Sequence, residues 1–140
     1  MSKSVLAAID LNREEAGGPV LRRAAELAKM DGASLSVITV IPDFGQGFVA
    51  SFLPEDAMAQ AMEDAAERLR LYVDRVLPNH PATRHVAEGT VHHEVLDCAA
   101  RIGADLIVVG THEPTVTDLL IGPNAAHIVR HAKVSVLVVR

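Results

Sequence analysis

The chain has 140 residues, of which 49% are hydrophobic, and a formal net charge of −5. We expect residues 1–140 to form one domain, because a chain of this length buries roughly two thirds of its unfolded surface without a metal or disulfide. The chain is net acidic and lacks the cluster of basic side chains that would bind nucleic acid or an anionic membrane surface. Its apolar runs are shorter than the roughly 18 residues of a membrane span. We therefore predict no nucleic-acid partner and no membrane partner.

The amino terminus and the cysteine content predict a cytoplasmic location. The first strand pattern begins at Ser4, which leaves no room for a secretory signal. The single cysteine, Cys98, cannot form an internal disulfide, as is usual in a reducing compartment.

Along the chain, short apolar runs typical of buried strands alternate with longer segments of helical period. The predicted strands occupy residues 5–9, 34–41, 83–87, 105–110 and 134–140. The predicted helices occupy residues 18–31, 55–77, 91–102 and 123–132. Gly18 and Pro19 mark the start of the first helix, and Gly32 and Gly103 are suited to end the first and third helices.

This alternation of strands and helices predicts an α/β fold, a doubly wound parallel sheet with helices on both faces. Ligands in such sheets bind outside the carboxyl ends of the strands, where the winding direction reverses. If the first and fourth strands flank that point, Asp10 and Gly110 face each other across the crevice.

Two glycines in the last quarter of the chain predict an anion site. Gly110 ends the fourth strand, and Gly122 with Pro123 opens the last helix. Glycine lets the main chain approach a ligand closely, and the free N–H groups of a helix start attract an anion. The main-chain amides beside these glycines are therefore candidates for holding a phosphate.

The common phosphate-binding and phosphotransfer motifs are missing. No GxGxxG follows the first strand, and no glycine-lysine pair of a Walker loop occurs. Asp10 has no clustered acidic neighbours after the first strand, which argues against a receiver domain. No nucleophile and base, no pair of acids and no metal cage is evident, so we assign no catalytic and no metal residues and expect hydrolysis to be slow or absent.

The segment from Gly110 to Arg140 contains the runs Gly110-Thr-His-Glu-Pro, Leu-Ile-Gly122-Pro-Asn-Ala-Ala and Val-Arg-His-Ala. With these runs it resembles the closing segment of a universal stress protein. The Val-Leu-Ala-Ala-Ile-Asp10 opening is similar to that family as well. The resemblance spans the chain and is specific in its last thirty or so residues, where it is nearest to the small bacterial F/G-type branch. It implies a flavodoxin-like five-stranded sheet with strand order 3-2-1-4-5, a homodimer, and binding of ATP or AMP, with Mg²⁺ accompanying the nucleotide.

The resemblance also implies which residues contact the nucleotide. Ala8, Ile9 and Asp10 would line the adenosine pocket, with Asp10 near the adenine, the ribose or a bound magnesium ion, and Val40 would offer its backbone to the adenine edge. The floor and phosphate loop would be formed by Val109, Gly110, Thr111 and His112, and the phosphate-cradling helix start by Gly122, Asn124 and Ala125.

Some of these positions have a second interpretation. Asp10 could cap a turn, and His112 could be a solvated loop side chain. The family pattern has glycine where Glu113 stands and serine or threonine where Pro123 stands, which leaves open a nucleotide-free dimeric adaptor that binds an unidentified protein. A nucleotide-cleaving enzyme that uses Asp10 and a divalent ion is a third interpretation.

The last strand is a candidate sheet edge, and an open apolar edge invites pairing. The resemblance implies that it meets its twin in a symmetric dimer through Val136, Leu137, Val138 and Val139.

Two further groups of side chains have alternative interpretations. His127 and His131 are four residues apart on a predicted helix, but no third ligand is evident, and surface histidines are the simpler interpretation. Phe44, Phe48 and Phe52 lie in one long loop, where they either pack on the core or form a lid or partner surface.

Overall fold

The computed structural model describes residues 1–42, 54–111 and 122–140. Its strands are β1 (Ser4–Ile9), β2 (Ser34–Ile41), β3 (Thr83–Glu88), β4 (Leu106–Gly110) and β5 (Ser135–Val139). Its helices are α1 (Glu14–Asp31), α2 (Ala57–Val76), α3 (Val91–Ile102) and α4 (Pro123–His131), and a 3₁₀ turn, η1 (Leu11–Arg13), precedes α1. Phe44, Phe48, Phe52, His112 and Glu113 lie outside the described residues.

The five strands form one parallel sheet in the order β3-β2-β1-β4-β5, which confirms the doubly wound, flavodoxin-like prediction. β1 lies at the centre, with β2 on one side and β4 on the other. Because the chain winds outward in opposite directions from this strand, the carboxyl ends of β1 and β4 border the crevice where such sheets bind ligands.

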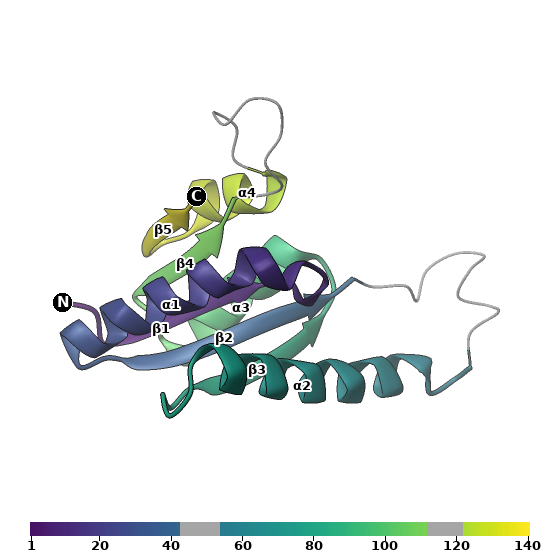
Figure 1. Cartoon of the computed structure of the whole chain (residues 1–140). Helices are drawn as coiled ribbons and strands as arrows, with labels where there is room; N and C mark the ends of the chain where they lie inside the picture. The colour runs from purple at the N-terminus through teal and green to yellow at the C-terminus, as the bar shows by residue number, and fades with distance from the viewer. Residues whose placement is uncertain (43–53, 112–121) are drawn as a thin grey trace.

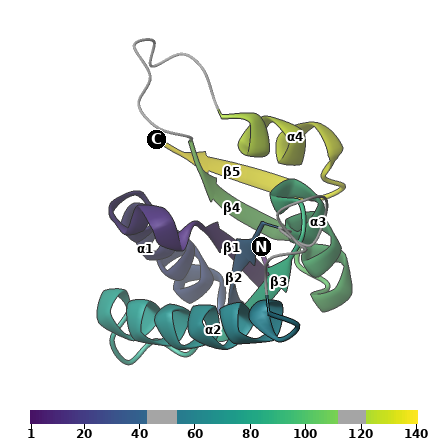
Figure 2. The same ribbon diagram turned by 90° about the vertical axis from the view of Figure 1, so that its right-hand side faces the viewer.

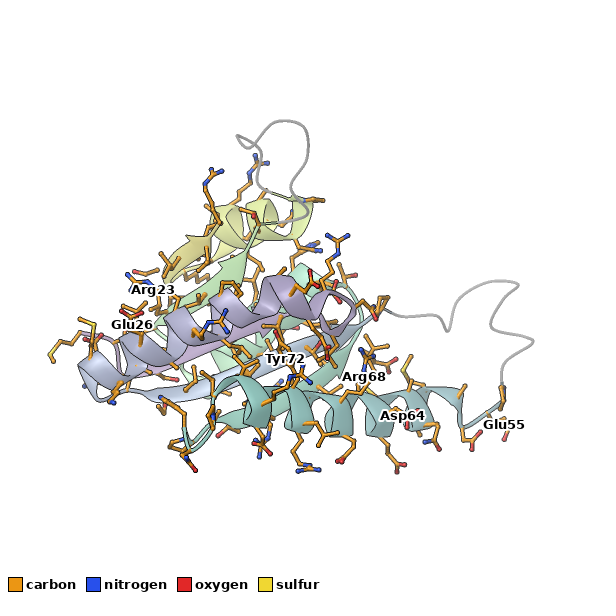
Figure 3. All side chains as sticks on the ribbon, in the orientation of Figure 1. Arg23, Glu26, Glu55, Asp64, Arg68 and Tyr72 are labelled. Carbon is orange, nitrogen blue, oxygen red and sulfur yellow. The ribbon has the colours of Figure 1, made fainter. Side chains whose placement is uncertain are left out.

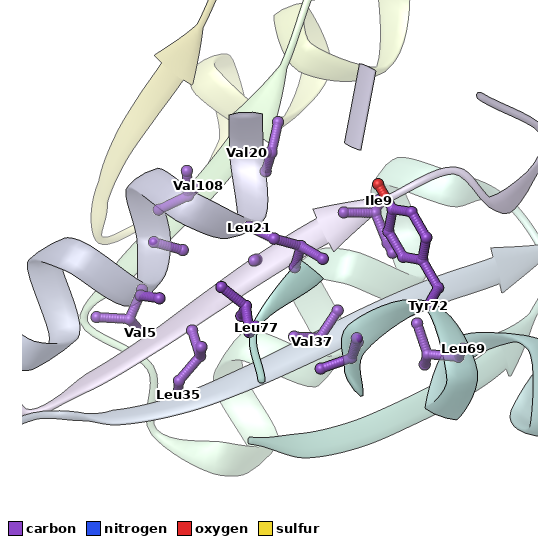
Figure 4. Packing of buried hydrophobic residues seen from close by; sticks show 14 of the residues in the cluster. Val5, Ile9, Val20, Leu21, Leu35, Val37, Leu69, Tyr72, Leu77 and Val108 are labelled. Atoms are coloured by element: carbon purple, nitrogen blue, oxygen red, sulfur yellow. The ribbon is translucent and has the colours of Figure 1, made fainter. Parts of the chain in front are cut away.

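The helices cover the two faces of the sheet in pairs, α1 with α2 and α3 with α4 (Figures 1 and 2). Alternate residues of β1 supply the two cores, since successive side chains of a strand point to opposite faces. Val5, Ala7 and Ile9 pack under α1 and α2, where Figure 4 shows the larger of the two clusters. Leu6 and Ala8 pack under α3 and α4.

The first helix begins earlier than the glycine and proline predict. It starts at Glu14 instead of Gly18, and Pro19 lies within it. Asp10 caps the preceding turn by accepting a hydrogen bond from the amide of Asn12 at 2.9 Å, so the chain is already helical before it reaches the glycines. Gly17 is required for packing, because a Cβ there would lie 2.7 Å from the hydroxyl of Tyr72.

Side chains of α2 hold this irregular entry to α1 in place. Arg68 donates to the main-chain carbonyl of Leu11 at 2.9 Å, and the Tyr72 hydroxyl donates to the carbonyl of Glu14. Figure 3 shows both side chains on the side of α2 that faces α1. The turn between β1 and α1 is therefore fixed by side chains that lie 57 and 58 residues further along the sequence.

The predicted glycine caps are confirmed. Gly32 ends α1 and Gly103 ends α3, both in the left-handed conformation, with φ of 65° and 69°. Their amides donate to carbonyls in the last turn of each helix, the arrangement that favours glycine at this position.

The last strand, β5, is an edge of the sheet, as predicted, and its residues Val136 to Val139 are half-buried. Among the described segments, no helix has the length and hydropathy that a bilayer crossing requires.

Candidate functional site

A cleft lies at the carboxyl ends of β1 and β4, at the point where the winding direction reverses. Its walls come from the start of α1, the end of β2, the start of α3 and the start of α4. The lining residues are Ala8, Ile9, Asp10, Arg13, Ala16, Gly17, Val20, Ile38, Val40, Val91, Val95, Val109, Gly110, Thr111, Gly122, Asn124, Ala125 and Ile128.

The structure brings together in this cleft every sequence-predicted site residue that it describes. Ten positions meet there from four separate stretches of sequence: Ala8, Ile9, Asp10, Val40, Val109, Gly110, Thr111, Gly122, Asn124 and Ala125. Asp10 and Gly110 thus border one crevice. The remaining predicted residue, His112, lies outside the described part of the chain.

The sequence did not indicate the part of the wall formed by α1 and α3. Arg13, Ala16 and Gly17 were missed because α1 was predicted to begin at Gly18. Val91 and Val95 were placed on the third predicted helix without a role in the site, because apolar residues four apart are typical of a buried helix face. No feature of that spacing distinguishes a core face from the wall of a cleft.

Asp10 both caps a turn and lines the cleft. One carboxylate oxygen accepts the amide of Asn12, and the other lies 3.9 Å from Nε of Arg13. The Asp10 and Arg13 side chains are 58% and 32% exposed, so a ligand in the cleft can reach both charges. Asp10 offers an acceptor and Arg13 a cation at the same end of the site.

Gly110 keeps β4 close to α1. A Cβ at this position would lie 3.1 Å from the side chain of Val20, which is tighter than ordinary van der Waals contact. The glycine therefore serves helix–sheet packing as well as the floor of the cleft.

The amides beside Gly110 and those beside Gly122, the two candidates for binding an anion, differ in whether they already donate hydrogen bonds to described residues. The amide of Thr111 donates to the carbonyl of Val139 at 3.1 Å, extending the β4–β5 pairing, so it is not free to hold a phosphate. This corrects the expectation that the amides beside both glycines are available.

At the start of α4, by contrast, the amides of Asn124 and Ala125 have no acceptor among the described residues. The first intrahelical bond there runs from Ala126 to Gly122 at 2.9 Å. Pro123 supplies no N–H, but it is exposed and does not line the cleft, so it does not fill the space. The positive end of α4 can therefore accept an anion through two main-chain donors.

The cleft has an apolar interior and a polar end. Its volume is about 140 Å³. A cavity of about 150 Å³ holds one aromatic ring, so a larger molecule must extend from the apolar part toward Asp10, Arg13 or the start of α4. This shape suits a ligand with a flat ring at one end and an anionic group at the other.

A model of the universal stress protein family matches residues 1–140. The chain belongs to this family. Universal stress protein G of Shigella flexneri is 30% identical to it over 143 residues, with 100% of each chain covered.

Solved structures of family members share the fold. A universal stress protein from Archaeoglobus fulgidus in complex with dAMP has a TM-score of 0.66 and 19% identity, covering 99% of this chain and 98% of its own. A universal stress protein in complex with cAMP has a TM-score of 0.62 and 20% identity, covering 99% of this chain and 97% of its own. At such identities the likeness establishes the architecture alone.

Proposed function

We propose that this universal stress protein binds ATP or a related adenine nucleotide such as AMP in the cleft between β1 and β4. It acts as a stress or metabolic responder with slow or no hydrolysis. The observation that carries the proposal is the pair of amides at the start of α4, which have no acceptor within the described part of the chain and border the same cleft as the carboxyl end of β1. The family members bound to dAMP and cAMP support the choice of an adenine nucleotide.

In the proposed complex the adenosine occupies the apolar part of the cleft beside Ala8 and Ile9, with the backbone of Val40 at the adenine edge. The phosphates extend to the amides of Asn124 and Ala125. Asp10, an exposed carboxylate at the rim, would hold a magnesium ion that arrives with the nucleotide. Such an ion would neutralise phosphate charge.

Slow or absent hydrolysis follows from the chemistry of the described lining residues. Their ionisable side chains are Asp10 and Arg13, which lie within reach of each other, and no histidine, cysteine or lysine joins them. Activation of a water molecule needs a base held beside it by a further group. An aspartate already committed to a turn cap is a poor candidate for that role.

The proposal includes a homodimer through β5 and a cytoplasmic location. β5 is a sheet edge with half-buried valines, the type of strand that pairs with a second copy. Cys98 is the one cysteine and is buried, in keeping with a reducing compartment.

Nucleotide binding is tested in two steps with the purified chain. The denatured protein is first analysed for released adenine nucleotide. ATP, AMP and adenosine are then added, each with and without Mg²⁺, and the melting temperature is measured. A ligand at about 100 times its Kd adds about 2.7 kcal/mol of stability, so absence of both released nucleotide and any thermal shift would leave the nucleotide-free adaptor as the function.

A blocking variant locates the site. Substitution of Gly110 by a bulky residue would disturb Val20 and confuse folding with binding. Ala16 is exposed on α1 and lines the cleft, so Ala16→Phe fills the space without changing the core. Ala66→Phe, at an exposed position of α2, is the matched control. We expect the thermal shift to disappear in the first variant and persist in the second.

A further inference from the structure

Four histidines form a row across the contact between α3 and α4. The central pair is His92 on α3 and His127 on α4, whose ring centroids are 4.2 Å apart with an interplanar angle of 13°. The ring centroids of His93 and His92 are 6.4 Å apart with an interplanar angle of 15°, and those of His131 and His127 are 6.0 Å apart with an angle of 14°. The sequence predicted no partner for His127 and His131, because His92 belongs to another helix.

The row is not arranged as a metal site. Nearly parallel rings direct their in-plane nitrogen lone pairs side by side instead of toward one point, whereas zinc sites need convergent ligands. Within residues 1–42, 54–111 and 122–140, no three histidine, cysteine, aspartate or glutamate side chains surround a common metal position. The stacked geometry instead suggests that protonation of the rings changes the strength of the contact between α3 and α4.

The groups around the central pair offer little compensation for added positive charge. The titratable and charged residues of the surrounding elements are His93, Glu94, Asp97, Cys98 and Arg101 on α3, Arg130 and His131 on α4, Lys133 after it, and Arg84, His85 and Glu88 on β3. β1, β2 and β5 contribute no ionisable side chain. None of the four imidazoles in the row forms an ion pair with a carboxylate in the described part of the chain, and Glu94 lies against Gly89.

We propose that the His92–His127 stack is an acid-sensitive contact that holds α3 against α4 while at least one ring is neutral, and that loosens when both rings carry a proton. Histidine is the side chain whose charge ordinarily changes between about pH 5 and 8. Two unit charges about 4 Å apart repel by an amount worth about fivefold in an equilibrium constant even at the dielectric constant of water. His93 and His131 add further positive charge at the ends of the row.

This contact joins the two helices that form one wall of the cleft. Val91 and Val95 of α3 and Asn124, Ala125 and Ile128 of α4 line the cleft, and the two stacked rings come from the same two helices. Acidification is therefore expected to loosen one side of the cleft. The inference does not depend on nucleotide binding and is tested on the protein without nucleotide.

The test is a double-mutant cycle with His92→Gln, His127→Gln and the double variant, measured by urea unfolding at about pH 5 and about pH 7.5. His127 is exposed and His92 is half-buried, so glutamine is tolerated at both positions. At the acid pH we expect a repulsive coupling of about fivefold or more in the unfolding constant, and at the higher pH no repulsion. His80→Gln, at a histidine outside the row, is the control and should keep the pH dependence of the wild type.

Amide hydrogen exchange provides a second measurement. After correction for the intrinsic exchange rate, the amides of α3 and α4 should exchange faster at the acid pH in the wild type, and this acceleration should be smaller in His127→Gln. A coupling that is equal at the two pH values would overturn the proposal. So would an acceleration of exchange that the substitution leaves unchanged.

Discussion

The hydroxyl of Tyr72 on α2 donates a hydrogen bond to the main-chain carbonyl of Glu14, the first residue of α1. Tyr72 is 2% exposed, so this bond joins two helices inside the core. The ring also lies against Gly17, which lines the cleft. The tyrosine therefore positions the α1 wall of the site without contacting a ligand.

Tyr72→Phe should lower the free energy of unfolding by about 1 kcal/mol at neutral pH, because a buried hydrogen bond is lost while the ring remains. Burial, followed by the carboxylate of Glu14, raises the pKa of Tyr72. A group with a raised pKa contributes stability that is complete below its unfolded value of about 10 and lost as the pH rises further. The stability difference between the wild type and Tyr72→Phe should therefore narrow in alkali.

Urea unfolding across the alkaline range measures this convergence. Tyr72 is the one tyrosine and the chain has no tryptophan, so its ultraviolet titration reports the same group directly. A tyrosine that ionises as in a free peptide would contradict the prediction.

His85 on β3 should make the fold sensitive to acid. Its Nε2 is buried with no hydrogen-bond partner among the described residues, and burial, followed by the charge of Arg101, lowers its pKa. The unfolded chain then binds the proton more readily, so stability falls as the pH decreases below about 6.5. His85→Leu should be at least as stable as the wild type at pH 7. The stability advantage of the variant over the wild type should increase as the pH falls. Thermal unfolding against pH is the measurement, and identical slopes for the two proteins would refute the prediction.

Asn124→Asp should weaken nucleotide binding through the phosphates. Asn124 is exposed in the first turn of α4, where a carboxylate stabilises the helix by about 0.3–1 kcal/mol. Its repulsion of a bound phosphate should cost roughly tenfold in affinity for ATP, and the affinity for adenosine should hardly change. Calorimetric titration with both ligands separates these effects.

The matched control for that change is Gln60→Glu, which places the same charge in the first turn of α2, away from the cleft. Equal weakening in both variants would show that net charge, and not the start of α4, determines the affinity.

Pro123→Ser should strengthen nucleotide binding. Pro123 is the first residue of α4 and has no N–H, and serine restores an amide and adds a hydroxyl. A hydrogen bond to a charged group contributes about 1.5–3 kcal/mol, so an increase in affinity of about tenfold or more is expected. Loss of the proline should lower stability by about 0.4–1 kcal/mol. Unchanged affinity, by calorimetry, would mean that the phosphates do not reach this turn.

Val138→Pro should separate the proposed dimer. The carbonyl of Val139 faces β4, where it accepts the amide of Thr111, so the neighbouring Val138 directs its amide away from the sheet. Proline is tolerated on an edge strand where the N–H faces outward. Light scattering should give twice the chain mass of 14.9 kDa for the wild type and the chain mass itself for the variant. A variant that remains dimeric would place the interface elsewhere.

The sequence alone determined the order of strands and helices and the family, and with these the residues that gather at the ends of β1 and β4. Strand and helix periods are local, and parallel strands joined by right-handed crossovers bring their carboxyl ends to one edge. The predicted residues from Ala8 to Ala125 could therefore be placed together, although Asp10 and Gly110 are far apart in the chain.

Only the tertiary structure decided where α1 begins, that the Thr111 amide is engaged by Val139, and which histidines are in contact. Arg68 and Tyr72 of α2 stabilise an early helix start at Glu14, overriding the local preference of Gly18 and Pro19. The carbonyl of Val139 on the edge strand accepts a hydrogen bond from the amide of Thr111. The packing of α3 on α4 stacks the ring of His92 on that of His127. Each of these contacts joins segments that are far apart in the sequence. Local sequence patterns do not determine such contacts, because they form only when the helices and strands pack together.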